Sequence, residues 1–337
     1  MTTLLDPAIL FFCFGLLAGA LRSNLEIPPQ IARFLSLYLL MALGLKGGFA
    51  LAASGLTREV ATTLAAALLL AVVVPLGGFR LLRRFLNGFD AAALAATYGS
   101  VSAVTFITAV QVLEQRDIAF GGHMAAAMAL MESPAIIIAI YLANALRKEA
   151  TATAALRVGG DGSVALAGPP APSPIGKILH ESFTDGAQLL LLGAMLIGIV
   201  TGEAGAETMK PFTQDLFKGM LALFLLDMGL SAARNMPRPR DVPASLALYA
   251  VLGPLVHATL ALGLSVVFGV SAGNAALLMV LAASASYIAV PAVVRYAIPE
   301  ARPALYVGMS LGVTFPLNIL LGIPLYIAVS QAVLGAA

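Results

Sequence analysis

Charge is scarce in this 337-residue sequence. Asp, Glu, Lys and Arg make up 11% of the residues, whereas the aliphatic, aromatic, Met and Cys residues make up 60%. A soluble domain averages about 25% charged and about 45–50% apolar residues, so this composition excludes an ordinary water-soluble globule. It also excludes a disordered chain, because disordered segments are rich in charge and poor in aliphatic side chains.

Neither sign of charge is in excess, and metal-ligating residues are few. The 19 Lys and Arg oppose 17 Asp and Glu without forming a basic block, which excludes a nucleic-acid binder. Cys13 is the single cysteine and there are three histidines, too few ligands for a dedicated zinc or iron–sulfur site. No H-E-x-x-H or paired intramembrane Asp motif occurs, so we expect neither an enzyme nor a bound cofactor.

Long apolar runs are what the sequence does have, and a helix needs about 20 apolar residues to cross the hydrocarbon. They predict an all-α integral membrane protein with ten transmembrane helices, here called spans one to ten. The runs cover roughly residues 7–21, 31–53, 61–79, 91–113, 118–146, 183–201, 212–233, 243–267, 274–294 and 303–331. The first run lacks the basic residues that precede the apolar part of a signal peptide, so we expect it to be retained.

Lys and Arg are distributed unevenly between the two sets of connecting loops. The loops that follow the odd-numbered spans carry 14 of the 19 cations, whereas the opposite side carries Arg58, Arg116 and Lys210. Lys46 and Lys218 lie within spans, near that second side. Because cytoplasmic loops are enriched in Lys and Arg, we expect a protein of the inner (plasma) membrane with both termini outside.

One long connection divides the chain into halves. Residues 147–180 are rich in glycine and proline and predict a flexible cytoplasmic linker between a first five-helix repeat, 1–146, and a second, 181–337. A shift of 184 residues places Ser100 on Ser284 and Ser102 on Ser286. Since five is odd, the second repeat must enter the membrane from the opposite side. A 5+5 inverted repeat is typical of secondary transporters.

Spans four and nine are small and hydroxylic at mid-depth, which predicts that both helices are broken there. Each second half-helix would then begin inside the membrane, and its free N–H groups and dipole would attract an anion. The alternative is that these segments are close-packing faces in which serine bonds back to its own helix. The candidate substrate-binding residues are Gly99, Ser100, Val101, Ser102, Thr105, Ser284, Ala285, Ser286 and Tyr287.

A carboxylate and an amide lie in the spans that follow the two serine segments. Glu132 precedes Pro134 in span five, and Asn318 follows Pro316 at the corresponding place in span ten. Carboxylate, amide and carbonyl oxygens suit Na⁺, so we predict that Glu132 and Asn318 form or support a cation site. The alternative is an interhelical hydrogen bond made by a protonated Glu132.

The string GSVSAVTF in span four, ASASYIAVPAVVRYA in span nine and the EAR-ALY-G-SLGVTFPLNI pattern of span ten resemble the sodium-dependent bicarbonate transporters of the SbtA type. This resemblance implies Na⁺/HCO₃⁻ symport by a core domain of spans 3–5 and 8–10 that moves against a gate domain of spans 1, 2, 6 and 7. It also implies a homotrimer and a PII-like regulatory protein at the cytoplasmic face. Sodium would lie close to bicarbonate, which adds Ser102 and Ser286 to the sodium candidates.

Two other kinds of transporter share parts of this pattern. A ten-helix inverted-repeat carrier of the bile-acid-symporter or auxin-efflux type has crossed broken helices but takes a larger organic anion. A cation/proton antiporter would use Glu132 and Asp227 as its exchanging carboxylates. A site large enough for only a few atoms would argue against the first, and an anion requirement would argue against the second.

Overall fold

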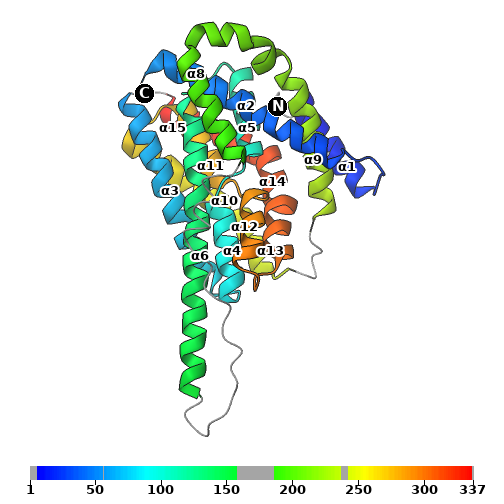
Figure 1. Ribbon diagram of the computed structural model, residues 1–337, viewed down its shortest axis with the longest axis vertical. Helices are drawn as coiled ribbons and strands as arrows, with labels where there is room; N and C mark the ends of the chain where they lie inside the picture. The colour runs from blue at the N-terminus through cyan, green and yellow to red at the C-terminus, as the bar shows by residue number, and fades with distance from the viewer. Residues whose placement is uncertain (1–5, 56, 158–185, 237–241, 336–337) are drawn as a thin grey trace.

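A computed structural model describes residues 6–55, 57–157, 186–236 and 242–335 of the protein. These residues form helices joined by turns and short irregular segments, with no β-strand among them. The all-α prediction is confirmed for this part of the chain. Figure 1 shows the helices as an elongated bundle in which the long helix α6 projects below the others.

The described residues of the first half form six helices, and polar side chains begin several of them. Asp6, Thr57 and Asn87 each accept a hydrogen bond from a backbone N–H in the first turn of α1, α3 and α4, respectively. The helices are α1 (Pro7–Ala20), α2 (Pro29–Ser54), α3 (Arg58–Leu82), α4 (Gly88–Gly99), α5 (Ala103–Gln115) and α6 (His123–Arg157).

The second half is less regular, because proline and glycine interrupt its helices. Gly269 ends α10 in the left-handed conformation, with φ 66°. Three π-helical turns, η2, η4 and η5, join helical segments that follow one another. The elements are α8 (Gly186–Lys210), η2 (Pro211–Asp215), α9 (Phe217–Arg234), α10 (Ala244–Phe268), α11 (Ala272–Ala283), α12 (Ala289–Ala297), α13 (Pro303–Met309), η4 (Ser310–Thr314), α14 (Phe315–Leu317), η5 (Asn318–Gly322) and α15 (Ile323–Leu334).

Seven helical stretches in the described residues are long and apolar enough to cross a membrane. One of them, Leu189–Arg234, has 46 residues and contains the non-helical Gly202, so it includes predicted spans six and seven. The helices α1 and α11 are apolar but shorter. The ten-span arrangement and the inverted repeat therefore remain predictions, whereas a helical protein with several helices long and apolar enough to cross a membrane is observed.

The predicted linker is wrong in its first part. Residues 147–157 continue α6 without interruption to Arg157, because the segment has neither glycine nor proline. The side chain of Arg147 makes an ion pair with Glu300 at 2.8 Å, so this region is held against the end of α12. Residues 158–180 lie outside the described part of the chain.

Two helix pairs, α1 with α9 and α2 with α8, make the most extensive helix contacts in the structure. Glycines bring their backbones together: Gly15 lies against Gly229 in the first pair, and Gly48 lies against Gly198 in the second. A Cβ on any of these four glycines would collide with backbone atoms of the facing helix. In Figure 1 the pair α1 and α9 lies at the upper right, beside the remaining helices.

The remaining helices enclose α4 and α11, which are almost completely buried. Every residue from Asp90 to Gly99 and from Gly273 to Ala283 is buried. Helices α3 and α6 pack on α4, whereas α10 and α15 pack on α11. Each enclosed helix runs directly into one of the two serine segments, so both segments lie deep inside the protein.

Candidate functional site

The predicted interruption of span four is present. The helix α4 ends at Gly99 and α5 begins at Ala103, and between them Ser100 and Ser102 have extended backbone conformations. A Cβ at Gly99 would lie 2.5 Å from the ring of Pro75 in α3. Glycine at the end of α4 therefore allows α3 to pack tightly against the break.

The interruption of span nine is also present, and it is longer. The helix α11 ends at Ala283 and α12 begins at Ala289, so residues 284–288 are non-helical. Ser284 has an extended conformation with φ −80° and ψ 166°. Both broken helices are thus observed at the serine pairs where the sequence places them.

The two breaks are hydrogen-bonded to each other. The backbone N–H of Ser102 donates to the Ser284 hydroxyl at 2.9 Å, and the backbone N–H of Ser286 donates to the carbonyl oxygen of Thr97 at 2.8 Å. These bonds join residues more than 180 positions apart in the chain. They hold the two serine segments side by side in the buried interior.

In each second half-helix a serine hydroxyl accepts a hydrogen bond from a backbone N–H of the first turn. The Ser102 hydroxyl accepts from the N–H of Thr105 at 3.2 Å and also contacts the Thr105 hydroxyl at 3.0 Å. The Ser286 hydroxyl accepts from the N–H of Val290 at 3.2 Å. Because the N-terminal end of a helix carries partial positive charge, both half-helices present a favourable environment for an anion.

A cavity of about 230 Å³ lies beside the two breaks. Five of the predicted site residues line it. The other lining residues come mainly from α2, α6, α8 and α12. The predicted residues in the lining are Val101, Ser102, Glu132, Ser286 and Tyr287.

The other predicted site residues do not line this cavity. Thr105 lies in the first turn of α5, where its N–H and its hydroxyl both donate to the Ser102 hydroxyl, and Gly99 packs on Pro75. Ser284 donates its hydroxyl to the carbonyl of Leu281 while it accepts from Ser102, so both of its hydrogen-bonding functions are used. Ala285 is buried in the packing around α4.

Asn318 and Ser100 also lie behind the cavity. The Asn318 amide donates to the carbonyl of Ala283 at 2.8 Å and accepts from the Tyr326 hydroxyl at 3.1 Å. Asn318 therefore supports the end of α11. The Ser100 hydroxyl is buried and has no hydrogen-bond partner among the described residues.

Sequence reasoning missed the wall of the cavity that faces the breaks. Ser36 and Leu40 of α2 and Ala187 and Leu191 of α8 line that wall. Ser36 is a hydroxyl residue in an apolar helix, which is a weak signal, and the three apolar residues have no distinguishing feature in the sequence. Their position follows from the packing of α2 and α8 beside α6.

A second polar network, also missed, joins α4 to η4 and α10. The Tyr98 hydroxyl lies 2.7 Å from that of Thr314, and Thr314 donates to the carbonyl of Ala250 at 2.8 Å. That carbonyl has no helical partner, because Pro254 four residues later has no N–H. The proline therefore provides the acceptor that links these three elements.

The comparisons with known proteins agree with this architecture. A search of curated proteins finds no match, whereas the family described as the Na⁺-dependent bicarbonate transporter superfamily matches residues 7–331. The several long apolar helices fit a multi-pass membrane protein of a family of transporters rather than enzymes. Because the match covers almost all of the 337 residues, the chain belongs to the Na⁺-dependent bicarbonate transporter superfamily.

Proposed function

We propose that this protein is a sodium-coupled symporter that takes up bicarbonate across the inner membrane by alternating access. The observation that carries the proposal is the meeting of two serine-capped half-helices, α5 and α12, beside one small cavity. Family membership supports bicarbonate as the substrate and sodium as the coupling ion. The reaction is transport, so no covalent step is involved.

The cavity suits a small anion that is held without a cationic side chain. Among its lining residues there is no Lys, Arg or His, so an anion there would be bound by hydroxyl groups and backbone N–H groups. The N–H groups of Ala103 and Val104, in the first turn of α5, have no acceptor among the described residues. A volume of about 230 Å³ corresponds to roughly eight water molecules at about 30 Å³ each. A cavity of this size holds bicarbonate together with several water molecules, and family membership favours bicarbonate over a large organic anion.

Sodium would bind on the same side of the breaks as the anion. Glu132 shares the cavity with Ser102 and Ser286, and together they provide a carboxylate and two hydroxyl oxygens. A cation there would offset the charge of the anion, which explains how the two solutes can be coupled. Asn318 is the remaining residue of the sodium site that we propose. It lies behind the break, where its amide donates a hydrogen bond to the carbonyl of Ala283.

In the alternating-access movement that we propose, one group of helices moves relative to another. The pairs α1/α9 and α2/α8 form a gate domain, and α3–α6 with α10–α15 form a core domain that contains both breaks. The cavity lies between the groups, because α2 and α8 supply one wall and the breaks supply the other. In an inverted repeat, α1 would correspond to α8 and α2 to α9, so the two helix pairs would be equivalent by symmetry.

Uptake of labelled bicarbonate into proteoliposomes tests the proposal directly. We expect an inward Na⁺ gradient to drive accumulation, and replacement of Na⁺ by K⁺ to abolish it. Uptake that is indifferent to Na⁺ would remove the coupling, and cation flux driven by pH without any anion would favour an antiporter instead.

The sodium site is tested by Glu132→Gln. Loss of the carboxylate charge should raise the Na⁺ concentration for half-maximal uptake by about ten-fold, since one charged ligand contributes about 1.4 kcal/mol or more. Glu203→Gln is a matched control, because Glu203 is an exposed residue of α8 that does not line this cavity. An unchanged Na⁺ dependence in Glu132→Gln would show that Glu132 only bridges helices.

The proposal extends to a homotrimer whose transport is inhibited by a PII-like protein at the cytoplasmic face. Native mass spectrometry of the purified protein should give three copies, and a monomer would contradict the assembly. Addition of a PII-like protein to the cytoplasmic side of oriented proteoliposomes should slow uptake. Equal rates with and without it would remove the regulator.

A further inference from the structure

A cavity of about 800 Å³, here called the outer vestibule, is separate from the cavity at the breaks. Its lining includes Ala53, Gly121 and Gly202, which lie next to three loops of the predicted outer side. The cavity at the breaks instead reaches Ala187 at the start of α8 and Val293 in α12, next to loops of the predicted cytoplasmic side. The two cavities therefore approach the middle of the protein from opposite predicted sides.

Three elements line both cavities, and each of them passes from one cavity to the other within two or three residues. The pairs of residues, with the one at the breaks first, are Leu40 and Leu43 in α2, Val104 and Phe106 in α5, and Met128 and Ala125 in α6. Three residues of α-helix span about 4.5 Å along the axis. The layer that separates the two cavities is therefore about one helical turn thick.

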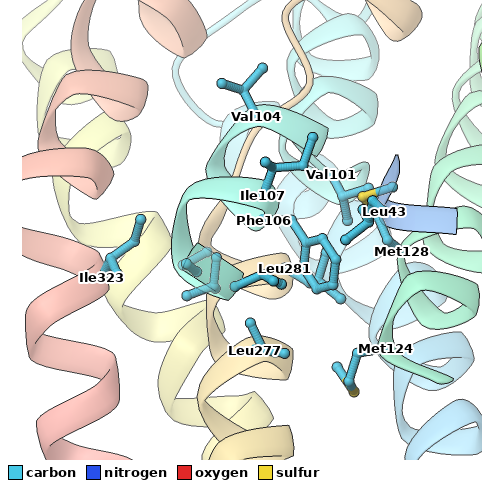
Figure 2. Packing of buried hydrophobic residues seen from close by; sticks show 14 of the residues in the cluster. Leu43, Val101, Val104, Phe106, Ile107, Met124, Met128, Leu277, Leu281 and Ile323 are labelled. Atoms are coloured by element: carbon cyan, nitrogen blue, oxygen red, sulfur yellow. The ribbon is translucent and has the colours of Figure 1, made fainter. Parts of the chain in front are cut away.

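Leu43, Phe106 and Met128, one from each of these elements, are here called the apolar seal. They are 4%, 1% and 2% exposed, and all three belong to one buried apolar cluster. Helix α2 packs against both α5 and α6. Figure 2 shows the three side chains together in the interior of the protein. The layer between the cavities is thus closed by apolar side chains.

An ion pair joins two of the three elements on the vestibule side of the seal. The Lys46 Nζ atom lies 2.5 Å from a carboxylate oxygen of Glu114, and both residues line the outer vestibule. Lys46 is three residues beyond Leu43 in α2, and Glu114 belongs to the same helix as Phe106. The pair therefore holds the helix of Leu43 against the helix of Phe106.

We propose that the apolar seal is the barrier that closes the site at the breaks from the outer side, and that it opens when the gate domain moves. This inference rests on the proposed uptake function. An anion that enters an apolar layer loses its water without gaining a hydrogen-bond donor, and a narrow apolar constriction also excludes water. Leu43 belongs to the proposed gate domain, whereas Phe106 and Met128 belong to the core domain. Movement of one domain against the other therefore separates Leu43 from its two partners.

Phe106→Ala tests the seal, with Ile107→Ala as the matched control. Both residues are buried in α5, but Ile107 lines neither cavity. Proteoliposomes are given a bicarbonate gradient without Na⁺, and a voltage-sensitive dye reports the membrane potential. A bicarbonate leak carries charge, whereas diffusion of CO₂ does not, so only the leak produces a potential.

We expect Phe106→Ala to raise the initial rate of potential change at least about ten-fold over the unmodified protein, because the truncation leaves a void in a one-layer barrier. Ile107→Ala should leave this rate unchanged. Phe106→Ala should also accumulate less bicarbonate under an inward Na⁺ gradient, because the solute leaks back.

A role for Phe106 in packing alone would give a different result. Both variants would then have lower melting temperatures without a leak, and that outcome overturns the seal, as would equal leaks in both. If Phe106→Ala does not fold, Leu43→Ala decides: a Na⁺-independent potential supports the seal, and its absence rejects it. Lack of Na⁺-driven uptake in the unmodified protein would instead overturn the proposed function, and the leak would still be measurable.

Discussion

The break between α4 and α5 takes three residues, whereas the break between α11 and α12 takes five. In the first, Ser102 directly precedes α5 and caps it through the N–H of Thr105. In the second, Ser286 lies three residues before α12, and its hydroxyl reaches the N–H of Val290, four residues further along. The same result, a serine-capped half-helix beside the cavity, is reached through two different local conformations.

The first serine of each pair, Ser100 or Ser284, lies two residues before the capping serine, and these two serines differ even more. Ser284 accepts the backbone N–H of Ser102 and donates to Leu281, so it connects the two breaks. Ser100, its equivalent by a shift of 184 residues, has a buried hydroxyl with no partner among the described residues. Positions that match in sequence thus have unlike roles, because the residues packed around each break are different.

The largest expected effect comes from replacing the two capping serines. Ser102→Val removes the hydroxyl that caps α5 and puts two methyl groups in its place beside the cavity. We expect the KM for bicarbonate to rise ten-fold or more, since a hydrogen bond to a charged solute contributes about 1.5–3 kcal/mol. Ser286→Val should raise the KM about three-fold, because the Ser286 hydroxyl accepts one hydrogen bond, from Val290, whereas the Ser102 hydroxyl accepts two, from Thr105.

Uptake kinetics in proteoliposomes measure this difference, with the amount of folded transporter determined by size-exclusion chromatography. Unchanged KM values in both variants would contradict the placement of the substrate at the breaks. Equal increases would contradict the asymmetry between them.

The second comparison concerns the ends of the first half-helices. A shift of 184 residues matches Gly99 with Ala283. Gly99→Ala should destabilise the protein by about 1–3 kcal/mol, because the new Cβ would overlap the ring of Pro75. Ala283→Gly should cost only about 0.5–1 kcal/mol, the backbone entropy of glycine. Thermal unfolding in detergent would show the difference, and equal melting temperatures would contradict it.

The third comparison concerns Ser284 and Ser100. Ser284→Ala leaves the buried N–H of Ser102 without its acceptor and should lower stability by about 1–2 kcal/mol. Ser100→Ala removes a hydroxyl that has no partner in the described part of the chain and should leave the melting temperature nearly unchanged. If Ser100→Ala also weakens bicarbonate uptake, its hydroxyl contacts the solute in another state of the transport cycle. A large loss of stability in Ser100→Ala would contradict the contrast between the two serines.

The smallest effect is expected at the far end of α12. Arg147 binds Glu300 through two hydrogen bonds and also donates to the carbonyl of Ala297, the last residue of that helix. The hydrogen bonds from Arg147 lower the pKa of Glu300 from its ordinary value of 4.5. The resulting stabilisation is present above pH 4.5 and is lost as the pH falls through the lowered pKa.

Glu300→Gln should therefore remove a small part of the acid sensitivity of unfolding while it leaves the neutral-pH uptake nearly unchanged. Melting temperatures between pH 3 and pH 7 provide the measurement, with the unmodified protein as the reference. An identical pH profile in the two proteins would show that this ion pair does not hold α12.

Much of the site could be predicted from the sequence. Apolar runs predicted the long helices, and the small hydroxylic segments predicted the breaks, because glycine and serine weaken a helix locally. Val101, Ser102, Glu132, Ser286 and Tyr287 line the cavity beside the breaks, and their role in binding stays a prediction. The prediction that the linker starts at residue 147 was wrong. The charged and small residues of 147–157 are compatible with a helix, and α6 continues through them.

The sequence by itself determined the properties that depend on neighbours along the chain: apolar character, helix length, helix interruption and the side chains present at each interruption. Only the tertiary structure decided which of those side chains face the cavity, which serine joins the breaks, and that Lys46 pairs with Glu114. The physical reason is that a hydrogen bond or ion pair between distant segments depends on how the helices pack. In a chain this rich in similar apolar helices, many packings satisfy the same hydropathy pattern.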